Sequence, residues 1–233
     1  MLSENIIQIL IYIHAAAGGI ALFTGPASFI AKKGQKWHRI FGKLFFYSMM
    51  VVSILALVIS ISPGHESLFL FSIGIFSAYL VCSGYRVLYL KSLSRNGKAQ
   101  LIDWIISSIM LVFGLVMIVH GIQLLLKNNM GGIVLLVFAF FALSLSITDF
   151  RLYTKETEDK SFWLFNHIGK MNGAVIAAYT AFIVVNDVLP GLLAWLGPIV
   201  PGFFVGYYFS NKYKKAITKN KKEPKEVVKI EID

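Results

Sequence analysis

The chain has 233 residues, of which 57% are hydrophobic and 15% are charged, and its formal net charge at pH 7 is +10. Soluble domains contain roughly 45–50% apolar and about 25% charged residues, so a single soluble core would not bury this much apolar surface. The composition therefore excludes an ordinary soluble domain and predicts an integral membrane protein, because lipid accepts apolar side chains on the outside of a helix bundle.

Long apolar runs follow one another along the chain. A helix needs about 20 such residues to cross the hydrocarbon layer, and backbone groups in lipid must pair within their own segment. The runs cover residues 6–30, 40–61, 68–90, 101–126, 131–150, 162–186 and 189–209. We therefore predict an all-α polytopic bundle of seven transmembrane helices, formed by a single domain at residues 1–210, and a basic tail at residues 211–233.

The basic residues predict the orientation. In a seven-span arrangement, 21 of the 22 Lys and Arg residues lie on one side of the membrane, and only Lys127 lies on the other. The positive-inside rule then places the C-terminus in the cytoplasm and the N-terminus outside, as in a multi-pass protein of the cell membrane. These basic residues lie at helix ends and in the tail, where they can contact anionic lipid headgroups. The expected partner is therefore the lipid bilayer and not nucleic acid. A second copy or a membrane partner protein is a further hypothesis.

Four histidines lie in or beside the apolar runs, where ionisable side chains are costly and are therefore functional candidates. Counted at about 1.5 Å per residue, His14 and His120 lie at similar depths below the outer ends of their runs. His38 and His167 lie near the inner ends of theirs. One interpretation is haem b, with His14 and His120 as an outer ligand pair, His38 and His167 as an inner pair, and no metal other than haem iron. The other is that small neighbouring residues let helices pack closely and each histidine bonds across an interface.

A denser polar group is predicted near the inner end of the bundle. It contains Arg39, Asp103, Asp149, Arg151 and Lys170, together with the inner histidines, and Tyr85 and Arg86 are predicted to lie nearby. Opposite charges at one depth can pair and so offset the cost of burial. Arg39 and Lys170 also suit a carboxylate or a phosphate. The group is thus either a structural ion-pair cluster or a site for a ligand, a proton or a substrate.

Prolines interrupt two of the predicted helices. Pro26 frees the carbonyl of Leu22, and Pro198 and Pro201 free those of Ala194 and Gly197. Free carbonyls in broken helices bind cations in some transporters. Alternatively, neighbouring groups compensate for each break and the proline produces only a kink.

Several motifs are similar to those of a known family. They include His14, Gly18, Gly25–Pro26, Trp37–His38–Arg39 and Gly42, and further along Gly84–Tyr85–Arg86, Asp103–Trp104 and His167 through Met171. This pattern resembles a family of uncharacterised bacterial multi-pass membrane proteins that is catalogued as a domain of unknown function. The resemblance implies a bacterial inner-membrane location, implies no activity, and adds weight to His14, His38, Arg39 and His167.

Three functions remain open from the sequence. The first is transmembrane electron transfer or haem handling through the intramembrane histidines. The second is small-molecule or proton-coupled transport through the inner polar group. The third is membrane assembly or sensing without chemistry. No nucleotide-binding or hydrolase motif is evident, so no catalytic residue is predicted.

Overall fold

The computed structural model describes residues 3–95, 97–154 and 159–222, and this part of the chain contains helices and no strands. The helices are α1 (Glu4–Ile30), α2 (Lys36–Ile59), α3 (Leu68–Arg86), η1 (Val87–Tyr89), η2 (Lys91–Arg95), α4 (Leu101–Leu126), α5 (Gly131–Thr154), α6 (Phe162–Val185), α7 (Gly191–Leu196) and α8 (Ile199–Lys222). Within the described residues, seven segments are long and apolar enough to cross a membrane, with α7 and α8 forming the last one together. The predicted all-α membrane bundle is confirmed.

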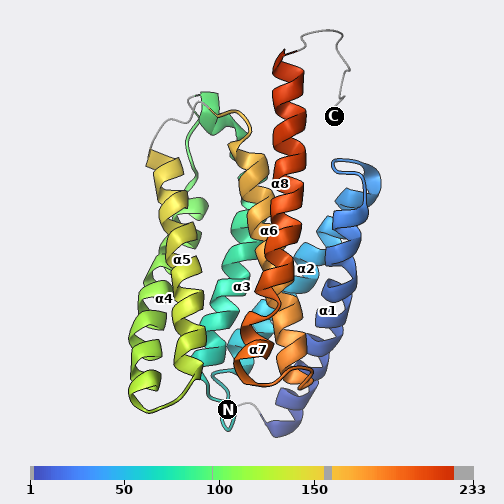
Figure 1. Cartoon of the computed structure of the whole chain (residues 1–233). Helices are drawn as coiled ribbons and strands as arrows, with labels where there is room; N and C mark the ends of the chain where they lie inside the picture. The colour runs from blue at the N-terminus through green and yellow to red at the C-terminus, as the bar shows by residue number, and fades with distance from the viewer. Residues whose placement is uncertain (1–2, 96, 155–158, 223–233) are drawn as a thin grey trace.

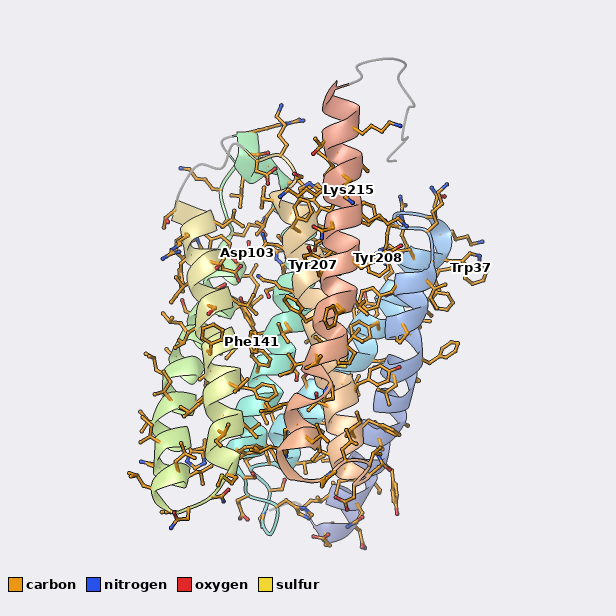
Figure 2. All side chains as sticks on the ribbon, in the orientation of Figure 1. Trp37, Asp103, Phe141, Tyr207, Tyr208 and Lys215 are labelled. Carbon is orange, nitrogen blue, oxygen red and sulfur yellow. The ribbon has the colours of Figure 1, made fainter. Side chains whose placement is uncertain are left out.

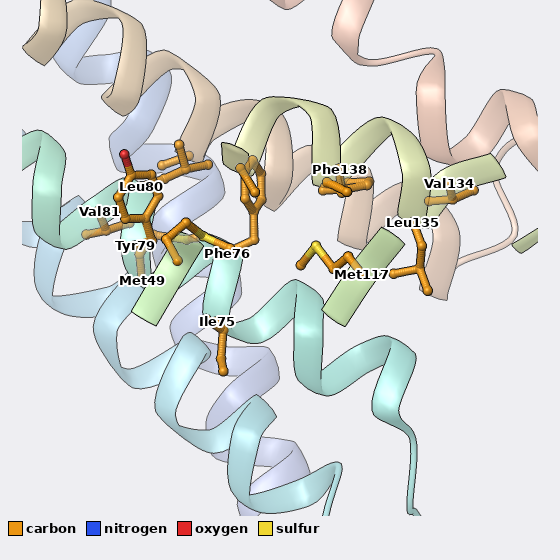
Figure 3. Close-up of a cluster of buried hydrophobic side chains, with 14 of the residues drawn as sticks. Met49, Ile75, Phe76, Tyr79, Leu80, Val81, Met117, Val134, Leu135 and Phe138 are labelled. Carbon is orange, nitrogen blue, oxygen red and sulfur yellow. The ribbon is translucent and has the colours of Figure 1, made fainter. Parts of the chain in front are cut away.

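Helix α3 lies in the middle of the bundle, where it contacts α2, α4, α5 and α6. The α4–α5 hairpin forms one side, and α1 forms the other, packed against α2 and α6 (Figure 1). Helix α8 packs against α6. Residues on α2, α3, α4 and α5 meet in one apolar core, whose members include Met49, Phe76, Met117 and Phe138 (Figure 3).

The two ends of the bundle differ in charge. The end that carries the α1–α2 loop, η1, η2 and the last turns of α8 is called the basic end below and lies at the top of Figure 1. Trp37, Tyr207 and Tyr208 are about 60% exposed and lie at similar heights near this end (Figure 2). Trp and Tyr favour the boundary between hydrocarbon and water, so these rings indicate where the bundle leaves the membrane.

The seventh span is predicted to end at residue 209, but in the described part of the chain no helix ends there. Helix α8 continues past residue 210 to Lys222, because this stretch contains no glycine or proline and is rich in Lys, a good helix former. The described part of the predicted tail is therefore helical, and residues 223–233 lie outside the described residues. The expected break falls between α7 and α8, beside Pro198.

Two of the carbonyls freed by proline have partners. The Leu22 carbonyl, opposite Pro26, accepts a hydrogen bond from the Tyr179 hydroxyl of α6 at 3.1 Å. The Gly197 carbonyl accepts the backbone N–H of Val200 at 3.2 Å. At Pro26 the compensation comes from a neighbouring helix and connects α1 to α6.

Candidate functional site

A buried ion pair lies between α5 and α6, inside the membrane-spanning part of the bundle. The Lys170 Nζ lies 2.5 Å from Oδ1 and 2.7 Å from Oδ2 of Asp149, and both side chains are 2% exposed. At about 1.5 Å per residue, Asp149 lies roughly 8 Å before the end of α5 and Lys170 roughly 12 Å past the start of α6. Both charges are therefore held below the membrane boundary near the basic end.

The Asp149 carboxylate is bonded by residues from two further helices. The Tyr79 hydroxyl of α3 donates to Oδ2 at 2.7 Å, and the Ser107 hydroxyl of α4 donates to the same oxygen at 3.1 Å. The Ser107 and Tyr153 oxygens are 3.2 Å apart. The Lys170 ammonium also lies 5.3 Å from the centre of the Tyr79 ring, where the ring face attracts a cation. Four helices thus meet at one carboxylate, and both of its oxygens have donors.

Gly84 allows α3 and α6 to approach closely beside this pair. A Cβ at position 84 would lie 3.0 Å from the Cβ of Lys170 and 3.1 Å from the sulfur of Met171. The Gly84 carbonyl is also 2.8 Å from the Nδ1 of His167. Gly84 therefore fixes where both Lys170 and His167 stand relative to α3.

A second ion pair lies closer to the basic end. Arg86 donates from Nε to Oδ1 of Asp103 at 2.8 Å and from Nη2 to Oδ2 at 3.0 Å. The Asp103 side chain is 1% exposed, whereas that of Arg86 is 23% exposed. Asp103 lies one helical turn from Ser107 on α4, so the two pairs are stacked along that helix. Asp103 also lies within electrostatic range of Lys170 and Tyr153.

Three of the predicted histidines bond to the backbone of a neighbouring segment. His14 meets the Val52 carbonyl at 3.0 Å, His38 meets the Ser28 carbonyl at 3.0 Å, and His167 meets the Gly84 carbonyl. A carbonyl only accepts, so Nδ1 carries a proton in each case, and a neutral ring then keeps its lone pair on Nε2.

The structure does not bring the outer histidine pair together. His14 is on α1 and His120 on α4, and these helices lie on opposite sides of the bundle (Figure 1). One iron would therefore not reach both imidazoles within one chain. His120 instead lines a pocket of about 420 Å³ at the end opposite the basic end, with Ser67, Phe69 and Asn129 among its neighbours. His38 and His167 do lie within electrostatic range of each other.

The predicted inner polar group divides into separate parts. Asp149 and Lys170 pair with each other, whereas Asp103 pairs with Arg86. Arg39 stands apart, exposed, with its Nε bonded to the Gly34 carbonyl at 2.9 Å. The sequence interpretation missed Tyr79, Ser107 and Tyr153. Helical spacing gives each of them a signal. Tyr79 lies seven residues before Arg86, and Ser107 and Tyr153 lie one turn after Asp103 and Asp149 on the same helix faces.

Within the part of the chain that the structure describes, no three or more His, Cys, Asp or Glu side chains are grouped so that they could hold a metal ion. No protein-family model, curated protein or solved structure matches the chain. The function is therefore argued from the geometry of the site.

Proposed function

We propose that this protein is a proton-coupled transporter and that the Asp149–Lys170 pair is its coupling site. The observation that supports the proposal is a pair of opposite charges, each 2% exposed, inside the membrane-spanning part of the bundle. Ionisable residues at membrane depth commonly form substrate pathways and proton relays. The Ser107–Tyr153 contact adds hydroxyls that can pass a proton to or from the carboxylate.

The chemistry of the pair suggests a substrate class. A proton arriving at Asp149 neutralises the carboxylate and leaves the Lys170 ammonium buried without a counter-ion, which is costly. A small anionic substrate, such as a carboxylate, removes this cost when it binds to Lys170. One proton and one monovalent anion then enter together, and the net charge of the site is unchanged.

The Arg86–Asp103 pair is the proposed gate of this pathway on the basic side. It holds α3 to α4 by two parallel hydrogen bonds, and it lies between the buried pair and the basic end. The same end carries nearly all the Lys and Arg residues that the structure describes, which supports a cytoplasmic C-terminus and a cell-membrane location.

Transport by purified protein tests the proposal. In proteoliposomes with an inward proton gradient, we expect accumulation of at least one radiolabelled anion from a panel of the monovalent anions acetate, lactate and glutamate. Lys170→Met and Asp149→Asn should lower this uptake roughly tenfold or more, because each removes one member of the coupled pair.

Thr148→Val is the matched control. Thr148 is the neighbour of Asp149 on α5, but its side chain is exposed and bonds only to its own helix, at the Ser144 carbonyl. The Thr148→Val variant should take up the anion at the wild-type rate. Gradient-driven uptake that survives in both Lys170→Met and Asp149→Asn would remove the pair from the mechanism.

A second candidate function is haem binding by His38 and His167. Both rings donate Nδ1–H to a backbone carbonyl, an arrangement that orients metal-ligating histidines and leaves Nε2 for the metal. Protein purified from haem-replete cells should then show a Soret band that His38→Ala and His167→Ala weaken and His120→Ala does not. A colourless preparation would exclude this function.

A further inference from the structure

Lys33, in the loop between α1 and α2, is held at the basic end by α1 and α8. Its Nζ donates to the Ser28 carbonyl at 3.0 Å and to the Phe29 carbonyl at 3.2 Å. It also lies 4.9 Å from the centre of the Phe29 ring and 4.6 Å from that of Phe209. The ammonium has three N–H donors, and these two carbonyls accept two of them.

Further basic side chains lie around Lys33 on other elements. His38 of α2 bonds to the same Ser28 carbonyl, and Lys212 of α8 lies within electrostatic range of Lys33. His167 of α6 lies within range of Lys33, His38 and Lys91. Lys91 of η2 stands over the Trp163 ring, 4.3 Å from its centre. We call these five residues, Lys33, His38, Lys91, His167 and Lys212, the Lys33 cluster.

Among the described residues, no ion pair joins the Lys33 cluster to a carboxylate. None of its members belongs to the pairs His65–Glu4, Arg86–Asp103 or Lys170–Asp149. The first turns of α2 and α6 contain no acidic residue, although a helix start favours negative charge. Like charges that are partly buried together repel one another, and burial together with the charge of Lys212 lowers the pKa of Lys33 to about 8. An anion would relieve this repulsion.

We propose that the Lys33 cluster binds a phosphate group at the membrane boundary. Phosphate presents several strong acceptor oxygens to the ammonium donors of Lys33 and Lys212. Basic pockets between transmembrane helices, at the membrane surface, bind anionic lipid headgroups. The exposed rings of Trp37, Tyr207 and Tyr208 place this part of the bundle at that surface. The phosphate belongs either to an anionic phospholipid or to a free ion, and the site is separate from the Asp149–Lys170 pair.

Binding should depend on pH in a defined direction. A bound phosphate favours the protonated amine, so it raises the pKa of Lys33 from about 8 toward the ordinary lysine value of 10.5. The affinity should therefore increase as the pH falls from this raised value to about 8 and should level off below pH 8. Lys212 of α8, His38 of α2 and His167 of α6 lie within electrostatic range of Lys33, and Lys91 of η2 lies within range of His167. Without the anion, the unfolded chain holds more protons than the folded one between pH 8 and the ordinary lysine pKa of 10.5, so stability rises with pH there.

The experiment uses the protein in nanodiscs and has two arms. In the first arm, inorganic phosphate is titrated into nanodiscs of phosphatidylcholine. In the second, phosphatidylglycerol replaces part of the phosphatidylcholine in phosphate-free buffer. The thermal unfolding midpoint should rise in one or both arms. Lys33→Gln/Lys212→Gln should weaken the apparent affinity roughly tenfold or more.

The matched control is Lys32→Gln/Lys214→Gln. It removes the same charge from the same loop and the same helix, but both residues lie outside the cluster. It should keep the wild-type response. A response to phosphate alone identifies the free ion as the source, and a response to phosphatidylglycerol alone identifies the lipid. No response to either anion, or equal losses in the two double variants, would overturn the proposal.

A second measurement covers the case in which Lys33→Gln/Lys212→Gln fails to fold. Reductive methylation with ¹³C labels the lysine amines of the wild type, and Lys33→Arg, which keeps the charge, assigns the Lys33 signal. Its pKa should rise when the effective anion is added. An unchanged Lys33 titration in the presence of both anions would also overturn the proposal.

Discussion

At the scale of single residues, the Asp149–Lys170 pair is held by complementary charge and by hydroxyl donors. Breaking a buried pair by removing one member typically costs about 3–5 kcal/mol, because the other charge stays buried alone. Lys170→Met should therefore destabilise the protein by about this much. Asp149→Asn/Lys170→Met should cost less, because the amide oxygen still accepts from Tyr79 and Ser107.

Unfolding in detergent, followed by circular dichroism, checks this prediction. The double variant should unfold at a higher temperature than Lys170→Met and should still be inactive in transport. A double variant that is no more stable than Lys170→Met would show that the unpaired Asp149 charge is not the cause of the lost stability.

Sequence reasoning finds the charged residues of the site but not their partners. Asp149 and Lys170 stand out because they interrupt apolar runs, and their depth follows from counting residues. The direction in which each side chain points depends on how the helices rotate and pack. For this reason the sequence places both Arg39 and Arg86 near Asp103, but only Arg86 pairs with it, and Arg39 bonds to the Gly34 carbonyl. The hydroxyls of Ser107 and Tyr153 lie one turn from Asp103 and Asp149, but this spacing alone does not predict that both reach the Asp149 region from two helices.

At the scale of helices, the break at Pro26 is compensated by α6 through Tyr179. Tyr179→Phe should destabilise the wild type by about 1 kcal/mol, the usual net value of a hydrogen bond. In a Pro26→Ala background it should cost less, since the alanine introduced at position 26 has a backbone N–H that bonds to the Leu22 carbonyl within α1. A double-mutant cycle measures the difference, and additive effects would contradict the proposed compensation.

Helix positions are well predicted because hydropathy follows the membrane closely. The first six apolar runs coincide with α1 to α6, and most ends of the runs lie within a few residues of the helix ends. Helix α2 begins before its apolar run, at Lys36, because basic residues continue a helix into the boundary region. The length of α8 is not predicted, since hydropathy falls beyond Tyr208 although the residues remain good helix formers.

At the scale of the whole molecule, the order in which helices pack is not predictable from the sequence. Equal depth suggested that His14 and His120 face each other, yet α1 and α4 lie on opposite sides of α3 and its neighbours (Figure 1). Depth is one coordinate, and the position of each helix around the bundle axis is set by contacts such as the close approach at Gly84.

The orientation of the whole chain is testable by labelling. In a Cys82→Ala background, which removes the only cysteine, Lys127→Cys and Lys215→Cys place one thiol at each end of the bundle. Because of the positive-inside rule, a membrane-impermeant maleimide should label position 127 in intact cells and position 215 only after lysis. The reverse pattern would contradict the proposed cytoplasmic C-terminus.

Helix α8 also has a mechanical consequence. Asn172, two residues after Lys170, bonds from Nδ2 to the Gly202 carbonyl at 2.8 Å, so α8 is attached to α6 near the buried pair. Beyond Tyr208 the helix continues to Lys222 as a rod of roughly 20 Å (Figure 1), and a tilt of about 10° at its base would move its tip by roughly 3–4 Å. A rearrangement around Lys170 would therefore be amplified into a displacement of the end of α8 on the basic side, and a molecule bound there would be displaced with it.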